Sequence, residues 1–162
     1  MPGRAVQGLA VQDFIAMILT GIADEAGALI DTQIKATREL GWTTIEMRAV
    51  EVPGFPKANL HEIPDAAFDV VERTLNEAGI GIYCFGSTIM NWAKTVETRF
   101  EVTLGEVRRA VPRMQRLGTQ FVRVMSFKPT DDEAVIPPVG FERVREVARM
   151  FLGAGLPPVH ES

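Results

Sequence analysis

The stretch that decides the fold is Leu117-Gly118-Thr119-Gln120-Phe121-Val122-Arg123-Val124-Met125-Ser126-Phe127. An amphipathic pattern that begins at Phe100 runs into it, and Gly118 follows the last apolar position of that pattern. Glycine just past a helix supplies the left-handed conformation that closes the helix. The residues from 121 to 127 are then mostly apolar, which is typical of a strand covered on both faces. The stretch therefore predicts the end of a helix, a tight turn and a buried strand.

The same arrangement occurs four times along the chain, with glycines at positions 41, 79, 118 and 155. A helical pattern precedes each glycine, and a fixed period of helix, glycine and strand is typical of stacked βα units. Such units form a parallel sheet with right-handed crossovers. Pro112 lies inside the third helical pattern and is expected to kink or split that helix. The sequence predicts four helices and about five parallel strands, at Ile18–Asp24, Thr43–Arg48, Gly81–Gly86, Phe121–Phe127 and Pro157–Glu161.

Two architectures accommodate these units, an open doubly wound sheet and a partial (β/α)₈ TIM barrel. An open nucleotide-binding sheet requires a glycine-rich loop after its first strand. Here that strand runs into Asp24-Glu25-Ala26-Gly27, which puts acid where a phosphate would lie. A complete barrel needs about 250 residues, whereas the chain has 162. Residues 17–162 are expected to form the α/β domain, and residues 1–16 an N-terminal extension.

The composition of the chain argues against some classes of function. The chain is 46% hydrophobic and 23% charged, with a formal net charge of -4. A mildly acidic chain lacks the basic surface of a nucleic-acid binder or of a protein held on anionic membranes. The single cysteine, Cys84, excludes a disulfide within the chain and predicts a reducing compartment, the cytoplasm. No partner among nucleic acids or membranes is therefore expected.

Ligands bind at the carboxyl ends of parallel strands in both architectures, and these ends are polar here. Glu46 and Arg48 share one face of their strand because they are two residues apart. They are either an ion pair or a carboxylate and a guanidinium that point at a substrate. Arg123 lies in an apolar run and needs a partner, either Glu46 or a sugar phosphate. His61, in a proline-rich loop, is a weaker candidate. The predicted substrate-binding residues are Glu46, Arg48, Ser87, Lys94, Arg123, Ser126 and His160.

Glu161 is the candidate metal ligand and catalytic residue. It follows Pro157-Pro158-Val159-His160 at the end of the last predicted strand. A carboxylate at a strand end suits a hard divalent cation. The alternative is that His160 and Glu161 form a solvated chain end.

Five motifs together resemble the sugar-phosphate isomerase/epimerase family, whose relatives include xylose isomerase. The resemblance covers about residues 17 to 162, and its last two motifs are the more specific. It implies a TIM barrel with one divalent metal (Mn²⁺, Mg²⁺ or Co²⁺) and a sugar or sugar-phosphate substrate. In that family the strand-five glutamate, which corresponds to Glu161, binds the metal and also acts as an acid/base group in the epimerase branch. The motifs lie at Gly21–Gly27, Ile45–Arg48, Cys84–Ser87 with Lys94, Phe121–Phe127 and Pro158–Glu161.

The chain ends one residue after Glu161, so the resemblance predicts the N-terminal portion of such a barrel. A truncated isomerase or epimerase of this kind is expected to be inactive and metal-free by itself. Its open barrel edges are expected to cause self-association, because unpaired strand edges and apolar patches promote it. One alternative is a non-catalytic half-barrel that serves in binding or assembly. Another is a small metal-free enzyme that uses Glu46, Arg48 and Arg123.

Overall fold

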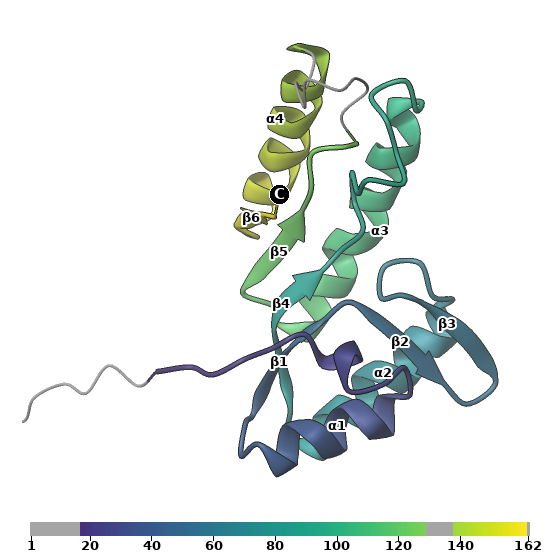
Figure 1. Cartoon of the computed structure of the whole chain (residues 1–162), viewed down its shortest axis with the longest axis vertical. Helices are drawn as coiled ribbons and strands as arrows, with labels where there is room; N and C mark the ends of the chain where they lie inside the picture. The colour runs from purple at the N-terminus through teal and green to yellow at the C-terminus, as the bar shows by residue number, and fades with distance from the viewer. Residues whose placement is uncertain (1–16, 129–137, 162) are drawn as a thin grey trace, which may run out of the picture.

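The computed structural model describes residues 17–128 and 138–161 (Figure 1). The N-terminal extension expected at residues 1–16 lies outside these described residues. Among them, a parallel sheet with strand order β1-β4-β5-β6 carries helices joined to it in the predicted alternation. The strands are β1 (Thr44–Met47), β4 (Gly81–Gly86), β5 (Phe121–Val124) and β6 (Pro158–His160). The helices are α1 (Ile30–Glu39), α2 (Asp65–Ala78), α3 (Phe100–Leu117) and α4 (Pro138–Gly153).

The four repeat glycines adopt the predicted left-handed conformation. Their φ angles are 72° at Gly41, 69° at Gly79, 63° at Gly118 and 77° at Gly155. A Cβ added at any of the four would meet no atom within 4 Å. The requirement for glycine is therefore the backbone conformation, which L-residues disfavour, and not a lack of space.

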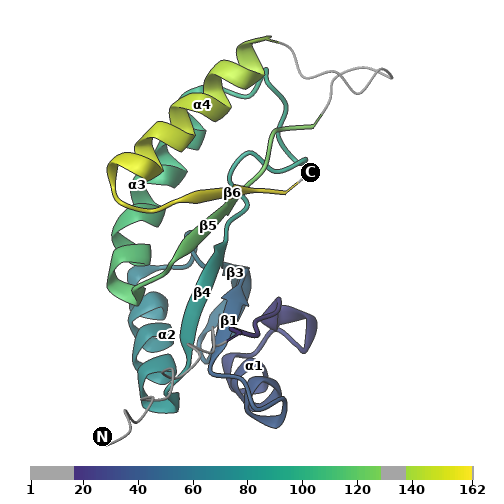
Figure 2. The ribbon, with the colours of Figure 1, turned by 90° about the vertical axis from the view of Figure 1, so that its left-hand side faces the viewer.

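The sheet has one face against helices. Figure 2 shows α2, α3 and α4 along one side of the curved sheet. Phe85 of β4 and Val122 of β5 are neighbours in register and fully buried in the hydrophobic core. Because side chains alternate along a strand, Cys84 and Arg123 point to the opposite face. This face corresponds to the interior of a barrel, and it carries the polar strand ends.

The predicted first strand, Ile18–Asp24, is wrong. The segment forms only one parallel bridge, between Ile22 and Glu46, and turns into a 3₁₀ helix, η1 (Ala23–Glu25). Ile18 and Leu19 are 54% and 52% exposed, so the start of the segment adds little to the core. Within the described residues the segment makes only this bridge to β1 before the chain turns into η1, so the parallel sheet described there has four strands.

Residues 49–59 form a hairpin that the sequence analysis did not predict. Strands β2 (Ala49–Val52) and β3 (Phe55–Asn59) pair antiparallel around Gly54, which has a φ of 84°. The strands are short, and Pro53 and Pro56 hide their alternation because proline is typical of loops and strand edges. The hairpin extends from the carboxyl end of β1 (Figure 1).

Helix α3 and strand β5 also differ from the prediction. Helix α3 is not split at Pro112. Both Pro112 and Arg108 are exposed, so the carbonyl that lacks its helical partner lies on the solvent side. Strand β5 ends at Val124 because the next amides bond to the loop after β4: Met125 N–H donates to Ile89 O (3.1 Å) and Phe127 N–H to Met90 O (2.7 Å). No helix among the described residues has the length and apolarity to cross a bilayer.

Candidate functional site at the strand ends

A buried guanidinium joins two carboxylates at the carboxyl ends of three strands. Arg123 Nη1 lies 2.8 Å from Glu161 Oε2 and 3.4 Å from Glu46 Oε1. Glu46 comes from β1, Arg123 from β5, and Glu161 is the residue directly after β6. These three predicted residues are therefore brought together by the fold.

The parallel register sets this arrangement. Arg123 lies beside Gly86 of β4 on one side and beside Val159 of β6 on the other. Gly86 leaves room for Glu46 to reach across β4, because a Cβ at Gly86 would lie 3.1 Å from both Glu46 Oε1 and the Cα of Arg48. The Glu161 N–H donates to Val124 O at 3.2 Å, which fixes the chain just beyond β6.

Burial raises the pKa of Glu46 above its ordinary value, the nearby Glu161 carboxylate raises it further, and Arg123 only partly offsets both. Burial, and then the negative charge of Glu46, raise the pKa of Cys84 to about 12, so the thiol keeps its proton. A carboxyl group with a raised pKa is suited to accept and return a proton near neutral pH.

These residues line an open pocket of about 280 Å³, together with Ile22, Val159 and His160. Its walls combine two carboxylates, one guanidinium and one imidazole with apolar surface, as in sites for small polar molecules. A larger hollow of about 390 Å³ lies beside α1 and Trp42. That hollow is mainly apolar and no group of titratable side chains converges on it, so the strand-end pocket is the better candidate.

Arg48 does not pair with Glu46. Its Nε lies 3.1 Å from Asp24 Oδ1, and its Nη2 lies 2.7 Å from Glu25 Oε1. The guanidinium therefore holds η1 against the end of β1. It does not line the strand-end pocket.

The remaining predicted residues have different surroundings. The buried Ser87 hydroxyl donates a hydrogen bond to the Arg123 carbonyl, and so connects β4 to β5. Lys94 Nζ lies 2.7 Å from Glu106 Oε1 and donates to Thr88 O at 3.1 Å, away from the pocket. Ser126 is buried and does not line the pocket, whereas His160 does.

The described part of the strand-end pocket does not by itself fit a metal ion. Glu46 and Glu161 both face the positive charge of Arg123, and a divalent cation needs several protein ligands. The one group of three potential ligands among the described residues is His61, Glu62 and Glu106, which lies elsewhere.

Sequence reasoning assigned no role to Cys84 in a site and did not single out Glu106. Glu106 is buried on α3, on the same stripe as Thr103, Val107 and Ala110. A charged residue on the apolar stripe of a helix is the signal that would have found it, because buried charges need partners.

No protein-family model and no curated protein matches this sequence. Solved structures do match its fold. A xylose isomerase-like TIM barrel protein from Mycobacterium smegmatis, in complex with magnesium, aligns with a TM-score of 0.61 and 19% identity over 88% of this chain and 54% of that protein. The 3-keto-D-glucoside 4-epimerase of E. coli aligns with a TM-score of 0.59 and 12% identity over 89% of this chain and 56% of the enzyme.

A third structure, the IOLI protein with a bound zinc atom, has a TM-score of 0.61 and 11% identity over 89% of this chain and 51% of that protein. The chain thus spans about half the length of the proteins it resembles. Its fold is that of part of a xylose isomerase-like TIM barrel, as the sequence motifs predicted. At these identities the likeness concerns the fold alone.

Proposed function

We propose that this chain forms the first half of a sugar isomerase or epimerase barrel of the xylose isomerase-like family, with Glu161 as an acid/base residue. The observation that carries the proposal is the Glu46–Arg123–Glu161 contact at the carboxyl ends of β1, β5 and β6. Active sites of TIM barrels lie at this end of the strands. The solved structures that share the fold include a sugar epimerase, which supports the choice of substrate class.

The proposed substrate is a sugar or sugar phosphate with a carbonyl next to a carbon that bears hydrogen and hydroxyl. The Glu161 carboxylate takes the proton from that carbon, and the electron pair of the broken C–H bond forms an enediolate. Arg123 stabilises the negative charge that develops on oxygen. In an isomerase, the hydroxyl proton of the enediolate moves to its other oxygen, and the protonated Glu161 gives its proton to the neighbouring carbon. In an epimerase, a protonated Glu46 instead gives its own proton to the opposite face of the same carbon.

The positions of the side chains support different parts of this proposal. Glu161 is half exposed, so it can reach a bound molecule while Arg123 orients its carboxylate. His160 lines the same pocket and is proposed as a further substrate contact. Arg48, Ser87 and Lys94 already have protein partners, and we assign them to positioning the strand ends instead.

A divalent metal in such a barrel would polarise the substrate carbonyl. Two of the similar structures contain magnesium and zinc. We propose Glu161 as one metal ligand. The other ligands would have to come from polypeptide outside the described residues, because the described part of the pocket does not fit a metal ion alone.

We also propose that the chain associates with a second copy through its open barrel edge at β6 and α4. Exposed apolar side chains lie on α4 and at the end of β6, including Phe141, Leu152 and Val159. Among the described residues β6 has a paired strand on one side only. The single cysteine, which is buried and free, is consistent with a reducing compartment such as the cytoplasm.

Binding to the chain is the experiment that tests the site, because the strand-end pocket is formed by described residues alone. Amide NMR spectra are recorded during titration with D-fructose and with D-fructose 6-phosphate. We expect saturable shifts around Glu46, Cys84 and His160 that disappear in Arg123→Met and persist in Arg149→Gln, a matched exposed arginine of α4. Absence of saturable shifts with either sugar would overturn the proposed site.

Catalysis is tested separately by the same titration in D₂O with Mn²⁺ present. Deuterium that enters the carbon next to the carbonyl, and that is lost in Glu161→Gln, would support the acid/base role. Binding without any exchange would instead support the alternative of a non-catalytic binding protein.

A further inference from the structure

His61 is a buried histidine whose ring nitrogens have no hydrogen-bond partner among the described residues. It follows β3, is 0% exposed, and neither ring nitrogen makes a hydrogen bond to any described residue. A neutral imidazole carries one donor and one acceptor, and burial of both without partners is unfavourable. Such a group in a folded protein calls for an explanation, because buried polar atoms nearly always have a partner, water or an ion.

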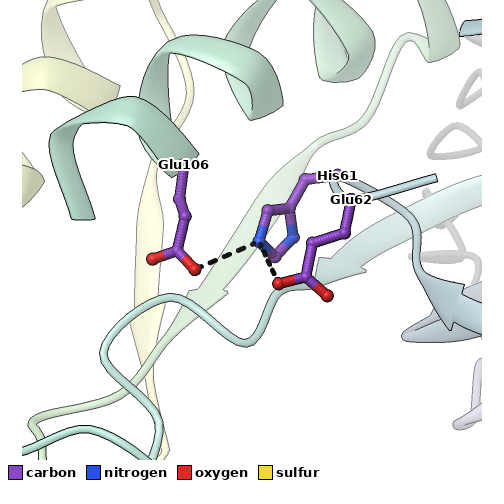
Figure 3. A group of neighbouring side chains, drawn as sticks. All are labelled: His61, Glu62 and Glu106. Atoms are coloured by element: carbon purple, nitrogen blue, oxygen red, sulfur yellow. Dashed lines mark ion pairs between the residues drawn. The ribbon is translucent and has the colours of Figure 1, made fainter. Parts of the chain in front are cut away.

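Two carboxylates face the same ring nitrogen. His61 Nε2 lies 3.9 Å from Glu62 Oε1 and 3.9 Å from Glu106 Oε1 (Figure 3). This distance is too long for a hydrogen bond. It is a little less than twice a metal–ligand bond of about 2.1 Å. Potential ligand atoms of all three residues lie within 4.8 Å of one another, so small side-chain movements would bring each into contact with one shared cation.

One carboxylate oxygen of Glu106 is available to a further ligand. Lys94 Nζ lies 2.7 Å from its Oε1, while its Oε2 is buried and has no hydrogen-bond partner among the described residues. The ion pair with Lys94 favours the ionised carboxylate, which is the form that binds a metal.

We propose that His61, Glu62 and Glu106 bind a divalent transition metal ion. An imidazole with two carboxylates favours Zn²⁺, Mn²⁺ or Co²⁺ over Mg²⁺ and Ca²⁺, which prefer oxygen ligands alone. The Glu62 side chain is 43% exposed, so the ion enters from that side and keeps water in its remaining position. The site is distinct from the strand-end pocket and does not depend on the proposed function.

The metal would join two parts of the fold. His61 and Glu62 lie in the segment after β3, and Glu106 lies on α3. The neighbouring Asn59 donates through Nδ2 to the carbonyl of Gly86 at 3.0 Å. A bound ion would therefore fix the hairpin end against α3 and, through Asn59, against the carboxyl end of β4.

The chain has two histidines, which makes a direct test available. In a chain labelled with ¹⁵N-histidine, Zn²⁺ at pH 7.5 should shift one ring nitrogen of His61 to saturation. The shift of His160 reports separately on the strand-end pocket. Glu62→Gln and Glu106→Gln should each weaken the His61 response at least about tenfold, and Glu161→Gln should leave it unchanged.

Lys94→Met supplies a test that poor folding cannot mimic. Loss of the ammonium removes a competing cation from Glu106, so this variant should bind Zn²⁺ more tightly than the parent chain. Zn²⁺ should also raise the midpoint of thermal unfolding, because it binds the folded state. A His61 signal that responds to pH alone, or that ignores millimolar Zn²⁺, would overturn the proposal. Unchanged affinity in both carboxamide variants would overturn it as well.

Discussion

Arg123 and Glu161 are 2.8 Å apart although one side chain is buried and the other is half exposed. Water therefore screens the charge of Glu161, whereas the guanidinium of Arg123 stays in the protein interior. Arg123→Met would leave the carboxylate of Glu46 partly buried without its partner. We expect a loss of about 3 kcal/mol in the free energy of unfolding at pH 7.5. Urea titration measures it, and Arg149→Gln, which should lose under about 0.5 kcal/mol, is the control.

The raised pKa of Glu46 predicts that the free energy of unfolding depends on pH above 4.5, the ordinary pKa of this group. Its pKa is raised in the folded state, so between the unfolded and folded pKa values the folded chain binds more protons. The free energy of unfolding therefore falls as pH rises through that window. Glu46→Gln should flatten this slope. Urea unfolding at half-unit steps from pH 4.5 to 7.5 measures it, and an unchanged slope would contradict the prediction.

The lowered pKa of Glu106 predicts that the free energy of unfolding changes with pH in the opposite direction, and at lower pH. Its pKa is lowered in the folded state, so its contribution to stability is present above 4.5 and is lost as pH falls through the folded pKa. Glu106→Gln should flatten the loss of stability below pH 4.5 and leave the slope above pH 4.5 unaffected. Chevron or equilibrium urea data from pH 3 to 4.5 test this. A change confined to the higher range would argue against it.

Gly86 is predicted to be intolerant of a side chain. A Cβ there would lie 3.1 Å from the Cα of Arg48 and from Glu46 Oε1, so Gly86→Ala should destabilise the fold by about 1–3 kcal/mol. Gly81 begins the same strand, and its nearest neighbour would be Thr44 Cγ2 at 4.0 Å. Gly81→Ala should be nearly neutral in thermal unfolding. Equal effects of the two substitutions would show that packing at Gly86 does not matter.

The Cys84 thiol is predicted to be unreactive in the folded chain. Its pKa, raised from 9.0 to about 12, lowers the thiolate fraction at pH 8 roughly a thousandfold. Ellman's reagent should modify it slowly in buffer and at once in 6 M guanidinium. Glu46→Gln should speed the reaction in buffer, since it removes a negative charge from the thiol. A fast reaction of the folded chain would contradict the assignment of a buried, protonated thiol.

Self-association is predicted from the exposed apolar side chains of α4. Phe141 is 57% exposed on this helix. Phe141→Glu should lower the average mass measured by light scattering at high concentration, whereas Glu142→Gln, an exposed neighbour, should not. A monomer at every concentration for the parent chain would contradict the proposed pairing.

The repeat of the fold could be predicted from local signals. The glycines at positions 41, 79, 118 and 155 each follow a helical pattern, and their left-handed conformation depends only on that local sequence. The end of β5 could not be predicted in this way. Met125 and Phe127 continue the apolar run, but their amides bond to residues 89 and 90, a contact between segments far apart in sequence.

Only part of the candidate site could be predicted from the sequence. Strand ends converge in a parallel sheet, so Glu46, Arg123 and Glu161 could be grouped from sequence. Which group pairs with which depends on strand curvature and on the space left by Gly86. Arg48 illustrates the limit: it shares a strand with Glu46, yet it binds Asp24 and Glu25. The His61 cluster depends on how α3 lies over the segment after β3, which no local pattern encodes.

The contact between Glu46, Arg123 and Glu161 has a consequence for the order of folding. Glu46 lies on the first strand of the sheet, and Glu161 follows the last. Contacts between residues so distant in sequence form late, since closing long loops carries an entropic cost that earlier contacts must offset. The local βα units can therefore form before the strand-end network does. The network assembles only when every strand has taken its place, so a functional pocket and a correctly completed sheet arise in the same step.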